Sequence, residues 1–253
     1  MRVAIIIPAR YASSRLPGKP LLRETGKYLI QHVYERACAA GCGADVVVAT
    51  DDERILAAVR SFGGRAVMTR PDHPSGTDRV AEVAVGLSAD VVLNLQGDEP
   101  LIDPGSLDLL AGLLESDPGA VMATLAVPIR DRAAYLSPSV VKVVCDDRGR
   151  ALYFSRAPIP MVRDGEPDFS ADPARFYQHL GVYAYRRLFL LQIAATRRHF
   201  LEETEKLEQL RVLGTGGGIR VGVVAEAHRG VDTPADYDAF VRAYRDGGTR
   251  RAA

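Results

Sequence analysis

Short apolar runs alternate with amphipathic helical patterns along the first hundred residues. The apolar runs lie at 2–9, 44–50, 65–69 and 90–95, and the helical patterns between them lie at 27–41, 53–63 and 78–87. Runs that are apolar on both faces are typical of strands buried within a parallel sheet. The alternation predicts an α/β fold whose doubly wound, mostly parallel sheet is covered by helices on both faces.

The pattern changes after about residue 118. Strand-like runs then follow in close succession, at 120–129, 140–146, 150–156 and 177–186. They predict a smaller, antiparallel extension of the mixed sheet. A helix is expected over 202–213, a strand over 218–224, and a last helix with Thr233 as its N-cap and Pro234 at its first position.

Composition excludes several classes of partner. Thirty-two Lys and Arg residues balance thirty-two Asp and Glu residues, so no net charge attracts nucleic acid or an anionic membrane. No apolar run approaches the roughly 18 residues of a membrane span. Cys38, Cys42 and Cys145 form no metal-binding pattern and are expected to be free thiols. We therefore expect a cytoplasmic protein.

A cationic loop follows the first apolar run. The stretch IIIPARYASSRLPGKPL, residues 5–21, carries Arg10, Arg15 and Lys19 among three prolines. It matches neither the Rossmann fingerprint nor the Walker A loop. Ligands of open α/β sheets bind at the carboxyl ends of strands, and guanidinium and ammonium groups suit phosphate or carboxylate. The loop is therefore either an anion site or a solvated basic turn.

Acidic residues occupy two other expected loops. Asp98 and Glu99 follow the fourth apolar run in NLQGDEP, and Asp232 precedes the last helix. Alone, Asp98 could be a turn residue and Asp232 a helix-entry residue. Mg²⁺ is typically held by one or two carboxylates together with substrate phosphates. Cations and carboxylates at one sheet edge would suit phosphoryl or nucleotidyl transfer.

These motifs resemble those of the 3-deoxy-manno-octulosonate (Kdo) cytidylyltransferases. The resemblance runs in order from residue 5 to about residue 234. It is carried by IIPARYASSRLPGKPL (6–21), VVVATDD (46–52), MTRPDHPSGTDR (68–79), VLNLQGDEPLI (92–102), MATLAVPI (122–129), VVKVV (140–144), ALYFSRAPIP (151–160), HLGVYAYR (179–186), LEQLRVL (207–213) and GVDTP (230–234).

The resemblance implies a reaction, an oligomeric state and a domain organisation. The 2-hydroxyl of Kdo attacks the α-phosphorus of CTP, giving CMP-Kdo and pyrophosphate with Mg²⁺, and so activates Kdo for lipopolysaccharide synthesis. A homodimer is implied, as is a fold like that of the nucleotide-diphospho-sugar transferases. The chain, 1–253, would form one domain with a nucleotide-binding half at about 1–118. Its other half, at about 119–245, would bind the sugar and form the dimer.

The resemblance also assigns residues. It gives the nucleotide to Ala9, Arg10, Arg15, Lys19, Ser75, Gly76 and Arg79. It gives the sugar acid to Arg15, Gln96, Arg156, His179, Glu208 and Gln209. Asp98 and Asp232 match the metal ligands, and Arg10, Lys19 and Asp98 form the catalytic set. Asp98 is the candidate for orienting or deprotonating the sugar hydroxyl.

Four of the sugar-side residues also have a structural interpretation. Arg156 could pair with a surface acid, His179 could be a hydrogen-bonded core histidine, and Glu208 and Gln209 could be solvated beside a leucine face. Three positions depart from the family pattern. Pro74 lies in the segment that carries Ser75 and Gly76, and Met161 and the glycine run 214–218 lie in the half expected to bind the sugar.

Two other functions fit the same sequence. One is a cytidylyltransferase for a neighbouring acidic sugar, either 8-amino-Kdo or a sialic acid. The other is a non-catalytic nucleotide-binding homologue, which the presence of Arg10, Lys19, Asp98 and Asp232 disfavours.

Overall fold

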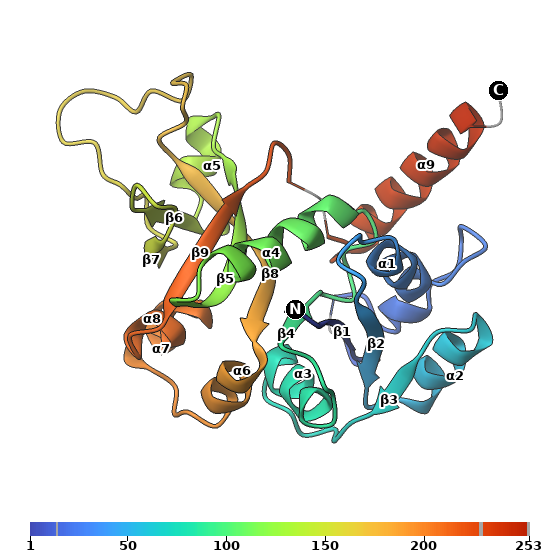
Figure 1. The fold of residues 1–253 in the computed structure, drawn as a ribbon. Helices are drawn as coiled ribbons and strands as arrows, with labels where there is room; N and C mark the ends of the chain where they lie inside the picture. The colour runs from blue at the N-terminus through green and yellow to red at the C-terminus, as the bar shows by residue number, and fades with distance from the viewer. Residues whose placement is uncertain (14, 228–229, 252–253) are drawn as a thin grey trace. The chain divides into compact units, whose positions relative to one another are not determined.

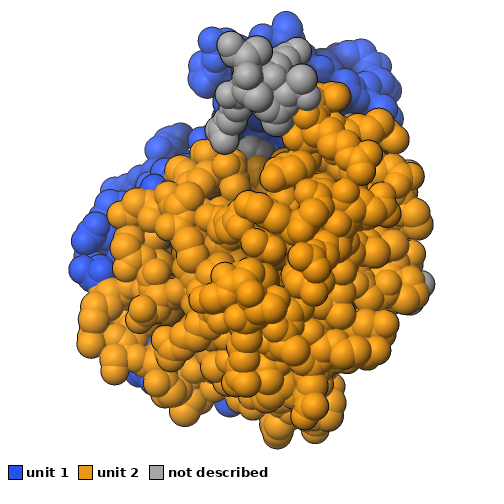
Figure 2. Space-filling model, turned by 90° about the vertical axis from the view of Figure 1, so that its right-hand side faces the viewer, with its two compact units in different colours: residues 1, 108–227 blue, residues 2–107, 228–253 orange. Residues whose placement is uncertain are grey.

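The computed structural model describes residues 1–13, 15–227 and 230–251, and it contains two compact units. Unit 2 comprises Arg2–Leu107 and His228–Ala253, and unit 1 comprises Asp108–Ala227 together with Met1. Figure 2 shows the two units in different colours. The C-terminal segment thus belongs with the N-terminal residues, and the units divide about ten residues before the change of pattern in the sequence.

Unit 2 is built on a four-stranded parallel sheet. Its strands are β1 (Val3–Ala9), β2 (Asp45–Thr50), β3 (Ala66–Met68) and β4 (Val91–Asn94), in the order β3-β2-β1-β4 (Figure 1). All three pairings are parallel. Every residue of β1 is buried, as the apolar run predicted for a strand covered on both faces. The predicted α/β class with a mostly parallel sheet is confirmed.

The described residues of unit 2 form several helices, some of which begin at capping side chains visible in the sequence. They are the 3-10 turn η1 (Lys19–Leu21) and the helices α1 (Leu29–Cys38), α2 (Glu53–Ser61), α3 (Gly76–Val85) and α9 (Pro234–Arg251). The Asp52 carboxylate caps α2 by accepting from the Arg54 amide, and the Ser75 hydroxyl caps α3 by accepting from the Asp78 amide. Each cap satisfies an amide that the helix leaves without a partner.

The C-terminal helix packs into unit 2 through a small apolar cluster. Val231, Tyr237, Phe240 and Val241 are buried against Leu29 of α1. Thr233 caps α9 as predicted, because its hydroxyl accepts from the Asp236 amide while the Asp236 carboxylate accepts from the Thr233 amide. Two buried aromatic residues and two valines therefore hold the segment that carries Asp232.

Unit 1 has a mixed sheet. Its strands are β5 (Ala120–Pro128), β6 (Lys142–Cys145), β7 (Ala151–Ser155), β8 (Tyr177–Arg186) and β9 (Gly218–Val223). Strand β8 pairs antiparallel with both β5 and β6, and β6 pairs antiparallel with β7, whereas β5 and β9 are parallel. The predicted antiparallel extension is therefore present, with one parallel pair beside it.

Short helices accompany this sheet. They are α5 (Arg132–Leu136), α6 (Arg187–Ala194), α7 (Phe200–Glu205) and α8 (Gln209–Gly214), while α4 (Pro104–Ser116) spans the point at which the units divide. No helix among the described residues is both long and apolar enough to cross a membrane.

The predicted single helix over 202–213 is wrong, because Lys206 adopts a left-handed conformation with φ of 54° and separates α7 from α8. The break allows a buried ion pair. Arg211 donates from Nε and Nη2 to the Glu202 carboxylate at 2.7 and 2.6 Å. In a continuous helix these residues would be displaced by about 13 Å along the axis, so they could not meet.

We predict that this pair stabilises unit 1. Glu202→Gln should lower the free energy of unfolding by about 3 kcal/mol, because it leaves the Arg211 guanidinium buried without its counter-charge. Urea denaturation followed by circular dichroism measures the change. Glu203→Gln, at the neighbouring exposed position of α7, is the matched control. Equal denaturation midpoints for the two variants would contradict the prediction.

Candidate active site

The cationic loop after β1 is closed by a glycine. Gly18 has φ of 66°, and its amide donates to the Tyr11 carbonyl at 3.1 Å. A Cβ atom at this position would lie 3.3 Å from the Tyr11 ring, so a side chain here would be both strained and crowded. This closure returns the chain so that Lys19, at the start of η1, lines the same pocket as Arg10.

A second glycine brings the segment after β4 against the end of β1. A Cβ atom on Gly97 would lie 2.9 Å from the Pro8 carbonyl oxygen, so the two backbones approach too closely for any larger residue. Gln96 and Asp98 flank this contact. The Asp98 carbonyl in turn accepts from the Val231 amide at 2.8 Å, which places Asp232 beside Asp98.

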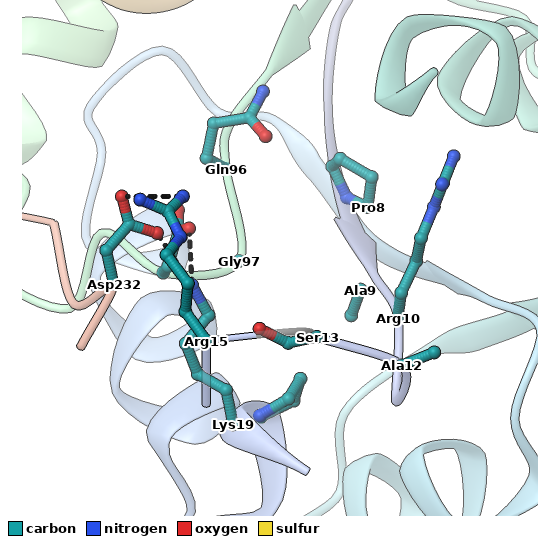
Figure 3. A pocket seen from close by; sticks show the side chains of 12 residues that line it. Pro8, Ala9, Arg10, Ala12, Ser13, Arg15, Lys19, Gln96, Gly97 and Asp232 are labelled. Carbon is teal, nitrogen blue, oxygen red and sulfur yellow. Dashed lines mark hydrogen bonds and ion pairs between the residues drawn. The ribbon is translucent and has the colours of Figure 1, made fainter. Parts of the chain in front are cut away.

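These segments of unit 2 surround a pocket of about 320 Å³ (Figure 3). It lies where the loops after β1 and β4 meet, at the carboxyl ends of these strands, as expected for an open α/β sheet. Its lining residues are Pro8, Ala9, Arg10, Ala12, Ser13, Arg15, Lys19, Pro20, Gln96, Gly97, Asp98 and Asp232.

Lys19 is the centre of the charged groups in this pocket. Its Nζ donates to Asp98 Oδ2 at 2.8 Å and to Asp232 Oδ1 at 3.2 Å, and only 12% of its side chain is exposed. The Arg15 guanidinium lies 3.3 Å from Asp232 Oδ2, and Figure 3 marks this ion pair with a dashed line. Two cations therefore balance two carboxylates, and the structure brings together residues assigned to phosphate and to metal.

The carboxylate pair fits a divalent cation that takes its other ligands from a substrate. The two aspartates flank one ammonium group and offer only oxygen donors, which hard cations such as Mg²⁺ prefer. Among the described residues, no group of three or more His, Cys, Asp or Glu side chains is arranged to enclose a metal. Such a pair suits Mg²⁺, which keeps several ligands from water or phosphate.

Glu99 follows Asp98 in the chain and lies close enough to both aspartates for their charges to act on it. Its burial raises its pKa to about 7, and the negative charges of Asp98 and Asp232 contribute in the same direction. The sequence placed Glu99 in this loop without assigning it a role. Its proximity to Asp232 depends on the return of the C-terminal segment, for which the sequence gives no local signal.

Ser75, Gly76 and Arg79, which the resemblance assigned to the nucleotide, lie at the start of α3. A Cβ atom on Gly76 would lie 3.5 Å from the Pro8 ring and 3.9 Å from Gln96 Oε1, so this backbone borders the pocket. Arg79 is fully buried and does not line the pocket. Its guanidinium donates to Asp51 Oδ2 at 2.7 Å and also contacts Thr69.

The sugar-side residues His179 and Gln209 lie together in unit 1. His179 Nε2 is 2.9 Å from Thr124 Oγ1, and Gln209 Nε2 is 3.4 Å from His179 Nδ1. Burial lowers the pKa of His179 to about 3, so the ring is neutral. The structural interpretation of His179 as a hydrogen-bonded core residue therefore describes its surroundings, and its contact with a sugar stays a prediction.

Arg156 is held by backbone groups and by one carboxylate. Its Nε donates to the Glu205 carbonyl at 2.8 Å and its Nη1 to the Pro138 carbonyl at 3.0 Å, while its amide donates to the Glu205 carboxylate at 2.9 Å. Glu208 immediately precedes α8 and is half-buried. The contacts of these residues with a sugar stay predictions.

The three departures from the family pattern have different surroundings. Pro74 is exposed just before the cap of α3, and Met161 is also exposed. The glycine run is closely packed, because a Cβ atom on Gly214 would lie 2.6 Å from the His199 ring and one on Gly217 would lie 2.8 Å from Val212.

Comparison with known proteins identifies the class of protein to which this chain belongs. The cytidylyltransferase family model matches residues 4–219, so the chain is a cytidylyltransferase. The chain is also 50% identical over 253 residues to the 3-deoxy-manno-octulosonate cytidylyltransferase of Geotalea daltonii, covering 98% of this chain and 100% of that one. It is 54% identical over 244 residues to that of Syntrophobacter fumaroxidans, covering 95% and 96%. The chain belongs to the 3-deoxy-manno-octulosonate cytidylyltransferase family.

Solved structures agree with this assignment. A CMP:2-keto-3-deoxy-manno-octonic acid synthetase complexed with CTP matches with a TM-score of 0.91 and 47% identity, over 98% of this chain and 100% of that one. A 4-diphosphocytidyl-2C-methyl-D-erythritol synthase from Anaerococcus prevotii shares the fold, with a TM-score of 0.62 and 13% identity over 97% and 96% of the two chains. The resemblance and fold expected from the motifs are confirmed.

We predict that Glu99 makes folding stability depend on pH. Its folded-state pKa of about 7 exceeds the usual 4.5, so between these values the folded chain retains a proton that the unfolded chain has lost. Stability therefore falls as pH rises through this window. Relative to the wild type, the free energy of unfolding of Glu99→Gln should rise by about 3 kcal/mol between pH 4.5 and pH 8.

The measurement is urea denaturation in the presence of EDTA at both pH values. Glu115→Gln, which alters an exposed carboxyl on α4, serves as the control and should follow the wild type. If the difference between Glu99→Gln and the wild type is the same at pH 4.5 and pH 8, the prediction is wrong.

Proposed function

We propose that this chain couples CTP and Kdo to give CMP-Kdo and pyrophosphate. The observation that carries the proposal is the pocket in which Lys19 joins Asp98 and Asp232, in a chain that is about half identical to named Kdo cytidylyltransferases over nearly its whole length. Cations for phosphates and carboxylates for a metal are thus gathered at one sheet edge.

The nucleotide would bind through the loop after β1. CTP carries about four negative charges, and a chain with no net charge must meet them with local cations. Arg10, Arg15 and Lys19 line the pocket and would contact the triphosphate, where they stabilise charge on the leaving pyrophosphate. Ala9, Ser75 and Gly76 would face the nucleoside, and Arg79 would act from beneath it by holding Asp51 and Thr69.

Asp98 and Asp232 would hold Mg²⁺. When bound, the ion would neutralise negative charge on the phosphates. Lys19 contacts both carboxylates, so it would exchange these contacts for phosphate oxygens as the substrate binds. The same ammonium group would thus stabilise the carboxylates of the ligand-free chain and the triphosphate of the complex.

The chemical step exchanges one phosphorus–oxygen bond for another. The 2-hydroxyl oxygen of Kdo forms a bond to the α-phosphorus, the bond to the bridging oxygen of pyrophosphate breaks, and the hydroxyl proton is lost. Asp98 would orient this hydroxyl or accept its proton, and Gln96 on the pocket wall would hydrogen-bond the sugar. Contacts of the sugar acid with Arg156, His179, Glu208 and Gln209 of unit 1 stay predictions.

The family resemblance supports a cytoplasmic homodimer as part of this proposal. Exposed apolar side chains on unit 1, at Met161, Leu188 and Phe200, are compatible with a partner surface. Of the other functions, the non-catalytic homologue is disfavoured because Lys19, Asp98 and Asp232 are present and in contact. Competition between Kdo, 8-amino-Kdo and a sialic acid would separate the remaining sugar substrates.

The deciding measurement is pyrophosphate release from CTP and Mg²⁺, with and without Kdo. We expect release that depends on Kdo. Asp98→Ala should lower it at least about 100-fold, because a lost metal ligand removes several kcal/mol of charge stabilisation. Asp238→Ala, at an exposed position of α9, is the control and should retain activity. Release without Kdo dependence, or an unaffected Asp98→Ala variant, would overturn the proposal.

The dual contact of Lys19 generates a separate prediction. Lys19→Met should bind Mg²⁺ at least about fivefold more tightly than the wild type in the absence of CTP, because the carboxylates lose the cation they share. The same variant should bind CTP more weakly. Calorimetric titration measures both affinities, with Lys27→Met, which removes a surface pair with Glu35, as the control. Weaker Mg²⁺ binding by Lys19→Met would contradict this prediction.

A further inference from the structure

The segment between β3 and α3, residues 69–75, is irregular and is anchored from α3. The Glu82 carboxylate accepts from the Arg70 amide, at 3.4 Å through Oε1 and 3.3 Å through Oε2. Glu82 Oε2 also contacts Nε2 of His73, whose side chain is only 3% exposed. One carboxylate thus joins the beginning and the middle of the segment.

The middle of this segment is where Arg10 makes its contact. Arg10 Nη2 donates to the His73 carbonyl at 2.8 Å. Among the described residues, this carbonyl is the acceptor for the Arg10 guanidinium. Arg10 lies apart from the Arg15–Asp232 pair in Figure 3, so it does not share the acidic cluster. Because a guanidinium is planar and rigid, fixing one amino group restricts the direction in which the others face.

The two ends of the segment are held by other residues. Arg79 contacts Thr69, and the Ser75 hydroxyl exchanges hydrogen bonds with Asp78. Loss of Glu82 would therefore release the region around Arg70 and His73 while the ends stay in place. Loss of Glu82 is therefore expected to move the His73 carbonyl without unfolding unit 2.

We propose that Glu82 is a positioning residue for the nucleotide: through the His73 ring it fixes the His73 carbonyl, and through that carbonyl it directs Arg10 toward the triphosphate. The inference rests on the proposed function for the identity of the ligand. It adds two side chains, Glu82 and His73, that do not line the pocket and to which neither the motifs nor the resemblance assigned a role.

A purely structural role would give a different pattern of effects. If Glu82 only satisfies a buried imidazole, its loss lowers stability and affects both substrates alike. If Glu82 acts through Arg10, its loss weakens CTP binding selectively and has no further effect once Arg10 is removed. A double-mutant cycle on CTP affinity distinguishes these cases.

The experiment measures CTP dissociation constants by calorimetric titration, together with KM for each substrate. Glu82→Ala should weaken CTP binding about tenfold, as expected for one lost charge-assisted contact, with KM for Kdo within about twofold. Glu82→Gln, which retains a hydrogen-bonding oxygen for His73 or Arg70, should recover part of the loss. In an Arg10→Ala background, Glu82→Ala should change CTP affinity less than about twofold.

Asp72→Asn is the matched control because it removes an exposed carboxylate from the same segment. Asp72 lies 4.0 Å from Arg70 and is 75% exposed, so CTP affinity should stay unchanged. If Glu82→Ala does not fold, the double-mutant cycle is measured with Glu82→Gln instead, alone and combined with Arg10→Ala. Unchanged CTP affinity, or fully additive losses in the cycle, would overturn the inference. A wild-type chain that binds no CTP would instead overturn the proposed function on which it rests.

Discussion

The contact of one lysine with two aspartates joins three distant parts of the sequence in unit 2. Lys19 follows the first strand, Asp98 follows the fourth, and Asp232 precedes the last helix. Each carboxylate by itself would be an exposed loop residue. Their approach to one another is favourable because an ammonium group lies between them. The cationic loop, the glycine contact at Gly97 and the packing of α9 all serve to bring these three charges together.

The geometry also explains why the site needs small residues at particular points. Gly18 closes the cationic loop in a conformation that other residues adopt only with strain, and Gly97 lets the segment after β4 touch the end of β1. Neither glycine contributes a functional group. They determine the positions of Lys19 and Asp98, whose side chains do.

Much of unit 2 and of its pocket could be predicted from the sequence. Apolar runs and capping residues are local signals, so the strands and the start of α9 were predictable. The cations and carboxylates could be chosen from motifs because they lie at the ends of such runs. The break at Lys206 could not be predicted, because the pairing of Arg211 with Glu202 is a tertiary contact. For the same reason, the burial of Arg79 and the Glu82–His73 contact were not predictable: both depend on how α3 meets a segment without regular structure.

The return of the C-terminal segment has a consequence for synthesis on the ribosome. Residues 108–227 of unit 1 form one continuous stretch, which is synthesised before the segment that completes unit 2. Unit 2 gains Val231, Tyr237 and Phe240 only from the segment that follows this stretch. Domains generally fold as units during synthesis. The pocket that Asp232 lines is therefore completed only after residues 108–227 have been synthesised, although the loop that opens it is made before them.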